Sequence, residues 1–149
     1  MSVRPIEKIK IFPDTDVLIP SLISKSGAAH FIVNELKVSK LTTQYSVDEM
    51  KAVVKRLKLS KKNTENIFAK GFETTKLSDS LSALAKSYEG YLLDKYDSHI
   101  LAGAVVGKAD FLLTYNLKHF KSDVIRKDFK LIVMCPGDFM QFIRSNYEV

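Results

Sequence analysis

Cysteine is almost absent from this chain, and long apolar runs are absent altogether. The single cysteine, Cys135, excludes an internal disulfide framework and a zinc site built from several thiolates. No stretch approaches the roughly eighteen uninterrupted apolar residues that a membrane helix needs. The opening segment, MSVRPIEKIK, lacks an apolar stretch followed by a small-residue cleavage site, so we expect a cytoplasmic protein.

Histidine is also scarce. The three histidines, His30, His99 and His119, are scattered along the sequence, and their spacing does not predict a zinc site. Repeats, linkers and low-complexity tracts are lacking as well. At 149 residues and 46% hydrophobic content, the chain can bury one full core but not two, which predicts a single domain over residues 1–149.

Positive charge exceeds negative charge. With 23 Lys and Arg against 17 Asp and Glu, the formal net charge is +6, which favours a polyanionic partner such as nucleic acid. Solvated lysines that bind no partner are the alternative, and net charge alone does not distinguish the two. The basic residues form two clusters: Lys55, Arg56, Lys58, Lys61 and Lys62, and then Lys118, Lys121, Arg126, Lys127 and Lys130.

Short apolar runs alternate with segments of helical periodicity. The apolar runs predict strands at 9–12, 41–43, 111–114 and 131–134. The periodic segments predict helices at 17–24, 28–36, 46–58, 60–70, 78–93, 97–106 and 136–144. Buried strands separated by helices are typical of a parallel sheet covered on both faces, so the predicted class is α/β, a three-layer α/β/α fold with a central parallel sheet.

Polar residues lie at the carboxyl ends of these strands, which is where ligands bind in such sheets. Asp14 follows the first strand, and Asn116 follows the strand at 111–114. Asp97 begins the helix that leads into that strand. These three residues can therefore converge at one edge of the sheet.

The helix predicted at 46–58 contributes a further acid. Glu49 lies at the border of its apolar stripe, whereas Asp48 lies nearly opposite the stripe and should face water. Several carboxylates in one cleft repel one another unless a cation neutralises them, and Mg²⁺ and Mn²⁺ prefer oxygen ligands. Taken singly, each polar residue also has a structural explanation as a turn former, a helix cap or a solvated side chain.

Four segments together resemble a known family. IFPDTDVLIPSL joins an apolar strand to Asp-Thr-Asp-Val-Leu, and TQYSVDEMKAVVKRL has Thr43 six residues before Glu49. DKYDSHILAGAVVGKADFLLTYNLKHF contains an Asp-x-x-Ile-x-Ala-x-Ala helix, a buried strand and a closing Phe. VMCPGDFMQFI consists of a strand, a proline and a Phe-containing helix. In this order, over residues 9–143, the segments resemble the PIN-domain nucleases, a family that includes the VapC-type toxins.

The resemblance implies a function and a set of site residues. It implies a Mg²⁺- or Mn²⁺-dependent endoribonuclease that hydrolyses RNA, with the toxin of a toxin–antitoxin pair as one biological role and an antitoxin protein and a homodimer as expected partners. Asp14, Glu49 and Asp97 take the places of the family's three metal-binding, catalytic acids. Asn116 takes the fourth catalytic place, which is often aspartate, and asparagine offers an oxygen without a negative charge.

The same resemblance suggests supporting residues. Asp94 stands where related proteins carry an accessory acid, with an exposed loop aspartate as the alternative. Thr15, Asp16 and Thr114 lie beside the acids and would support them. The nearby Lys118 and His119 would bind the RNA backbone, with a solvated face as the alternative.

Two other functions fit parts of the sequence. IFPDTDV also matches the opening of haloacid-dehalogenase-like phosphatases, in which Asp14 would be an aspartyl nucleophile. The Ser/Thr strand motif of those enzymes should precede the late acidic pair, yet LLTYN follows Asp97. A catalytically inert PIN-like module that binds RNA or protein is the second alternative, and the neutral Asn116 is the feature in its favour.

Overall fold

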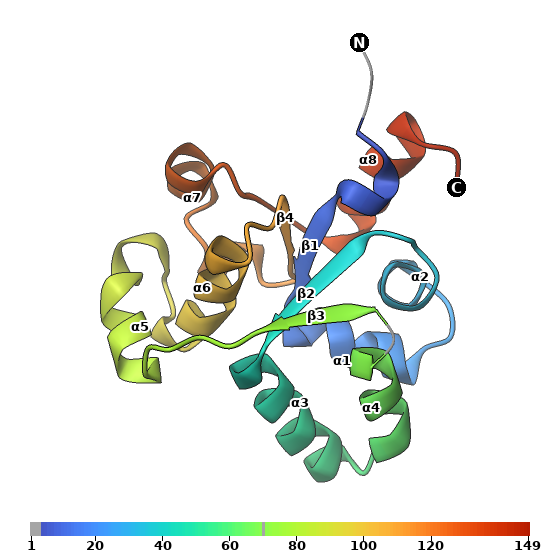
Figure 1. The fold of residues 1–149 in the computed structure, drawn as a ribbon, viewed down its shortest axis with the longest axis horizontal. Helices are drawn as coiled ribbons and strands as arrows, with labels where there is room; N and C mark the ends of the chain where they lie inside the picture. Colours follow the sequence, from blue (N-terminus) through green and yellow to red (C-terminus); the bar gives the residue numbers. More distant parts are fainter. Residues whose placement is uncertain (1–3, 70) are drawn as a thin grey trace.

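The computed structural model describes residues 4–69 and 71–149, and a five-stranded parallel sheet forms its centre (Figure 1). The order across the sheet is β3-β2-β1-β4-β5, so the first strand of the chain lies in the middle. Each neighbouring pair of strands is parallel, which confirms the predicted fold class. The strands are β1 (Lys10–Pro13), β2 (Ser39–Thr43), β3 (Phe72–Thr75), β4 (Phe111–Leu113) and β5 (Ile132–Met134).

Helices cover both faces of the sheet (Figure 1). Helices α1, α2, α3 and α8 contribute to the apolar core on one face, while α6 and α7 contribute to the core on the other. The α-helices are α1 (Thr15–Ile23), α2 (Ala28–Asn34), α3 (Gln44–Leu57), α4 (Lys61–Ala69), α5 (Leu81–Ser87), α6 (Ser98–Val106), α7 (Ser122–Phe129) and α8 (Pro136–Asn146). Short 3₁₀ helices lie at η1 (Ile6–Lys8), η2 (Glu89–Tyr91), η3 (Lys95–Asp97) and η4 (Leu117–His119).

The central strands are apolar on both sides because both sides are covered. On β1, Ile11 packs into one core and Phe12 into the other. On β4, Phe111 packs into the same core as Ile11, and Leu112 packs into the same core as Phe12. This alternation explains why both strands read as continuous apolar runs in the sequence.

One strand and one α-helix were not predicted, and one helix was predicted too long. The edge strand β3 has no fully buried side chain, so its sequence FETT gives no apolar run; it follows Gly71, whose φ of +135° favours glycine. Helix α7 has only eight residues, and its apolar stripe consists of the buried Ile125 and the partly buried Phe129, which is too short a repeat to mark a helix in the sequence. The helix predicted at 78–93 is wrong beyond Ser87, because the chain turns into η2 there and then pairs with a segment after β4.

Parts of two predictions lie outside the described residues. These parts are residues 1–3 of the predicted domain and Lys70 of the helix predicted at 60–70. None of the described helices combines the length and apolar character that crossing a bilayer requires.

Helix α6 lies close to the sheet at Gly103. A Cβ atom there would lie 2.5 Å from Cε2 of Phe12 and 2.7 Å from Cγ2 of Thr43. Alanine is intrinsically the better helix former, so a loss of stability on substitution would come from this steric conflict. We predict that Gly103→Ala lowers the free energy of unfolding by about 1–3 kcal/mol, measured by denaturant titration.

Gly137→Ala is the matched control, because Gly137 also lies in a helix but has no atom within 4 Å of a built Cβ. It should leave the free energy of unfolding unchanged or slightly higher. Equal effects of the two substitutions would contradict the close approach of α6 to the sheet.

Candidate active site

Asp14 lies directly after β1, and it is buried with 6% of its surface exposed. Its backbone N–H donates to the Leu113 carbonyl at 2.8 Å, and its own carbonyl accepts the N–H groups of Val17 and Leu18. Asp14 therefore ends the strand and starts α1 through its main chain. Its side chain makes no capping hydrogen bond and is left for other contacts.

The Thr114 hydroxyl joins two acids from the start of α1. Its Oγ1 lies 3.0 Å from Oδ2 of Asp14 and 3.1 Å from Oδ2 of Asp16. The Asp16 oxygen also accepts the backbone N–H of Tyr115 at 2.9 Å, and the N–H of Asn116 donates to Thr114 Oγ1 at 3.1 Å. The loop after β4 thus holds both carboxylates at the carboxyl end of the sheet.

Glu49 reaches the site from α3. The helix begins where Thr43 at the end of β2 accepts the N–H of Ser46 on its hydroxyl, at 3.2 Å. Glu49 is half-buried and Asp48 is exposed, as the helical periodicity predicted. Oε2 of Glu49 lies 3.1 Å from Nε2 of the buried His99. This hydrogen bond from His99 lowers the pKa of Glu49.

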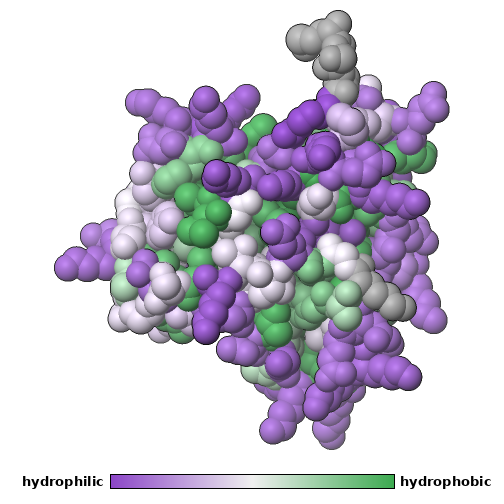
Figure 2. Space-filling view, viewed as in Figure 1, coloured by the Kyte–Doolittle hydropathy of each residue, from purple (hydrophilic) through white to green (hydrophobic). Residues whose placement is uncertain are grey.

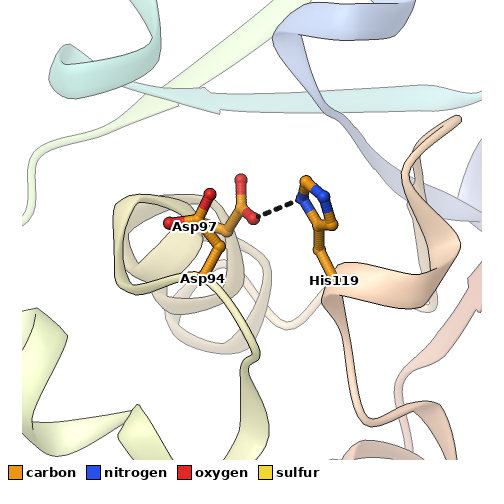
Figure 3. Close-up of side chains that lie close together, drawn as sticks. All are labelled: Asp94, Asp97 and His119. Carbon is orange, nitrogen blue, oxygen red and sulfur yellow. Dashed lines mark hydrogen bonds and ion pairs between the residues drawn. The ribbon is translucent and has the colours of Figure 1, made fainter.

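Asp97 occupies the N-cap position of α6 without making a capping hydrogen bond. Asp94 instead accepts the N–H of Tyr96 at 3.0 Å and caps the preceding 3₁₀ helix. The carboxylate of Asp97 turns towards His119, and its Oδ2 lies 3.0 Å from the imidazole Nδ1 (Figure 3). Asp97 therefore lies at the start of the helix, as predicted, but the capping bond is made by Asp94, one turn earlier.

The acids share one electrostatic environment. Burial raises the pKa of Asp14 to about 7, and the negative charges of Asp16, Asp97 and Glu49 add to that rise. Burial likewise raises the pKa values of Asp16 and Asp97. Four carboxylates from three separate segments are thus close enough to act on one another, and a cation among them would relieve both repulsion and desolvation.

The remaining residues singled out from the sequence lie around these acids. Thr15 is buried beside Asp14, whereas Asn116 is exposed and its side chain does not cap η4. Lys118 is exposed on the same short helix, and His119 is half-buried against Asp97. Asn116 therefore exposes its side chain, while its backbone N–H bonds the hydroxyl of Thr114 next to the carboxylates.

Two histidines contact the acids, and neither contact was predicted from the sequence. His99 meets Glu49 across 50 residues, and His119 meets Asp97 across 22. No local spacing rule predicts such contacts. The available signals were weak: His99 stands two residues after Asp97 in the helix that carries it, and His119 lies in the segment that follows β4.

Comparison with known proteins decides the family. A family model described as PIN domain matches residues 10–118, which include every acid named above. The chain belongs to the PIN domain family. The comparison with curated protein sequences gave no match. Family membership argues against the phosphatase alternative, whose motif order the sequence already failed to follow.

Solved structures share the fold of this PIN domain. A VapBC2 structure from Rickettsia felis, bound to a promoter DNA fragment, is 17% identical with a TM-score of 0.57, covering 84% of this chain and 97% of that one. A toxin–antitoxin complex from Klebsiella pneumoniae is 18% identical with a TM-score of 0.60, covering 82% and 95%. PAE2754 from Pyrobaculum aerophilum is 14% identical with a TM-score of 0.53, covering 93% and 98%.

The raised pKa of Asp14 predicts how stability depends on pH. The folded state holds the Asp14 proton more tightly than the unfolded state, so the free energy of unfolding should fall as pH rises from about 4 to about 7. We predict that Asp14→Asn, which keeps an oxygen acceptor for Thr114, makes this fall smaller and leaves the part that comes from Asp16 and Asp97. In a metal chelator at pH 8, the variant should be more stable than the wild type by at least about 1 kcal/mol.

Denaturant titrations at a series of pH values measure this difference. Asp48→Asn is the control, since Asp48 is exposed on the same helix as Glu49. If the free energy of unfolding changes with pH equally in the wild type and in Asp14→Asn, the prediction is wrong, because ionisation of Asp14 then does not destabilise the folded state.

Proposed function

We propose that this PIN domain is a metal-dependent endoribonuclease that hydrolyses phosphodiester bonds of RNA. The convergence of Asp14, Asp16, Glu49 and Asp97 at the carboxyl edge of the sheet carries the proposal. Buried carboxylates that repel one another are expected where a divalent cation is the natural counter-charge. Asp14, Glu49 and Asp97 are the proposed ligands.

The donor atoms fit Mg²⁺ or Mn²⁺, which both accept carboxylate oxygens. One buried carboxylate oxygen, Oδ1 of Asp16, has no hydrogen-bond partner among the described residues. Unsatisfied buried oxygens are uncommon, and they are expected where ligands or ordered water complete a site. When bound, the cation would supply positive charge that activates water and stabilises charge on the scissile phosphate.

Other side chains would hold the acids in place. Thr114 fixes Asp14 and Asp16 through one hydroxyl, and His99 orients Glu49. Asn116, which is exposed, offers an amide oxygen without charge. That neutral residue keeps the inert RNA- or protein-binding module as the alternative function.

The basic residues would bind the RNA backbone. All ten members of the two basic clusters are exposed, and Lys118 adjoins the acidic site on η4. Figure 2 shows hydrophilic residues gathered at the end of the molecule formed by α3 and α4, where the first cluster lies. Contacts with phosphates give affinity without sequence selection, so these residues would support binding rather than choice of target.

A toxin role in a toxin–antitoxin pair is the proposed biological setting. The Klebsiella pneumoniae structure is a toxin–antitoxin complex, and VapBC2 shares the fold. An antitoxin segment that covers the carboxylates would block the access of RNA to them. A cytoplasmic location and a homodimer stay predictions from the sequence and the family.

We predict that the purified protein cleaves single-stranded RNA when Mg²⁺ or Mn²⁺ is added and not in a chelator. Asp14→Asn and Asp97→Asn should each lower the cleavage rate by at least about 100-fold, because each removes a charged metal ligand. Asp48→Asn, one residue from Glu49 but exposed, should cleave at the wild-type rate. Gel assays on varied RNA substrates measure the rates, and circular dichroism checks folding.

Two outcomes would overturn the proposal. RNA that is bound but left intact with either cation would favour the inert module. Release of phosphate from a simple phosphomonoester, with an aspartyl-phosphate trapped at Asp14, would favour the phosphatase.

We also predict that expression of the chain alone arrests growth of a bacterial host, because its RNA would be cleaved. The Asp97→Asn variant, expressed at the same level, should permit growth. Co-expression of a small protein encoded next to this gene should restore growth to cells that carry the wild type. Normal growth with abundant, folded wild-type protein would contradict the toxin role.

A further inference from the structure

One group of possible ligands in the site is not composed of oxygen alone. Asp94, Asp97 and His119 each offer one ligand atom, and these atoms all lie within 4.8 Å of one another (Figure 3). Asp94 directly precedes η3 and Asp97 is its last residue, whereas His119 ends η4. Each of the three side chains is half-buried, so the group is open to ions from solution.

We propose that His119 is a metal ligand alongside Asp94 and Asp97, and that it makes the site selective for transition ions such as Mn²⁺ over Mg²⁺. The inference rests on the proposed cation site at Asp97 and deepens it. Mg²⁺ strongly prefers oxygen, whereas first-row transition ions also accept imidazole nitrogen. A ligand set of one nitrogen and two carboxylates therefore favours the transition ion.

The spacing of the atoms fits ligation. Two atoms that each lie about 2.1 Å from one ion, at right angles, are about 3 Å apart. Nδ1 of His119 and Oδ2 of Asp97 are 3.0 Å apart. Asp94 uses Oδ1 for the N–H of Tyr96, which leaves its second oxygen outside that bond.

The backbone brings the three residues together independently of any ion. The segment before Asp94 pairs with the segment around His119 through an antiparallel bridge between Leu92 and Phe120. Within this pairing, the Leu93 N–H donates to the carbonyl of His119 at 2.8 Å. Residues on both sides of the bridge are thus fixed before a metal arrives, which lowers the cost of assembling the ligands.

His119 also lies near Asn116, the neutral residue at the fourth catalytic position. Asn116, three residues earlier, takes the position where related proteins often carry aspartate, and it is exposed. The imidazole nitrogen of His119 would give the metal a ligand atom in place of that aspartate oxygen, without adding negative charge. The competing explanation is that His119 only positions Asp97 through a hydrogen bond.

Metal binding to the full-length protein distinguishes ligation from positioning. We expect calorimetry to give Mn²⁺ an affinity at least about tenfold above that of Mg²⁺, and electron spin echo modulation of bound Mn²⁺ to show coupling to a ¹⁴N nucleus. His119→Gln keeps a hydrogen-bond donor for Asp97 but no imidazole. It should lose the ¹⁴N coupling and most of the preference for Mn²⁺.

His30→Gln is the matched control, because His30 bonds Ser21 and Asn34 on the α1–α2 side and not the acids. It should keep both the ¹⁴N coupling and the preference. A ¹⁴N signal that persists in folded His119→Gln, or Mn²⁺ bound without any ¹⁴N coupling, would overturn the inference. If RNA is still cleaved in those cases, the proposed nuclease stands; if neither ion binds and RNA stays intact, both proposals fail.

Discussion

The parallel pairing of β1 with β4 determines where the rest of the site lies. The register partners run from Ile11–Phe111 to Pro13–Leu113, so both strands end at the same level. Asp14 continues the pairing by one more hydrogen bond, to the carbonyl of Leu113. A shift of one residue would exchange the two faces of β1, place its apolar side chains in the wrong cores and displace the carboxylate. The apolar contacts that stabilise the sheet therefore also fix the acid.

The features that depend on local pattern were predictable from the sequence. The apolar runs of β1 and β4 mark where the strands end, and so they locate Asp14 and Asn116. Helical periodicity gave the opposite orientations of Glu49 and Asp48. The three-layer fold follows from the alternation of such elements, since buried parallel strands need helices on both faces.

The features that depend on distant contacts were not predictable. Strand β3 buries none of its side chains fully, and helix α7 is too short for its apolar stripe to repeat. The histidine contacts join residues far apart in the chain, and the bridge between Leu92 and Phe120 that aligns Asp94 with His119 follows only from the folded loops. Charged and polar side chains carry little periodic signal, so their partners appear only once the sheet has assembled.

The burial that stabilises the sheet also forces the carboxylates together. The pKa of Asp14 is raised, His99 contacts Glu49, and His119 contacts Asp97. Anomalous diffraction from crystals soaked in Mn²⁺ tests most directly whether this arrangement holds a cation. We expect an anomalous peak about 2–2.6 Å from carboxylate oxygens of Asp14 and Asp97. Ordered carboxylates with no peak beside them at saturating Mn²⁺ would contradict a metal-dependent site.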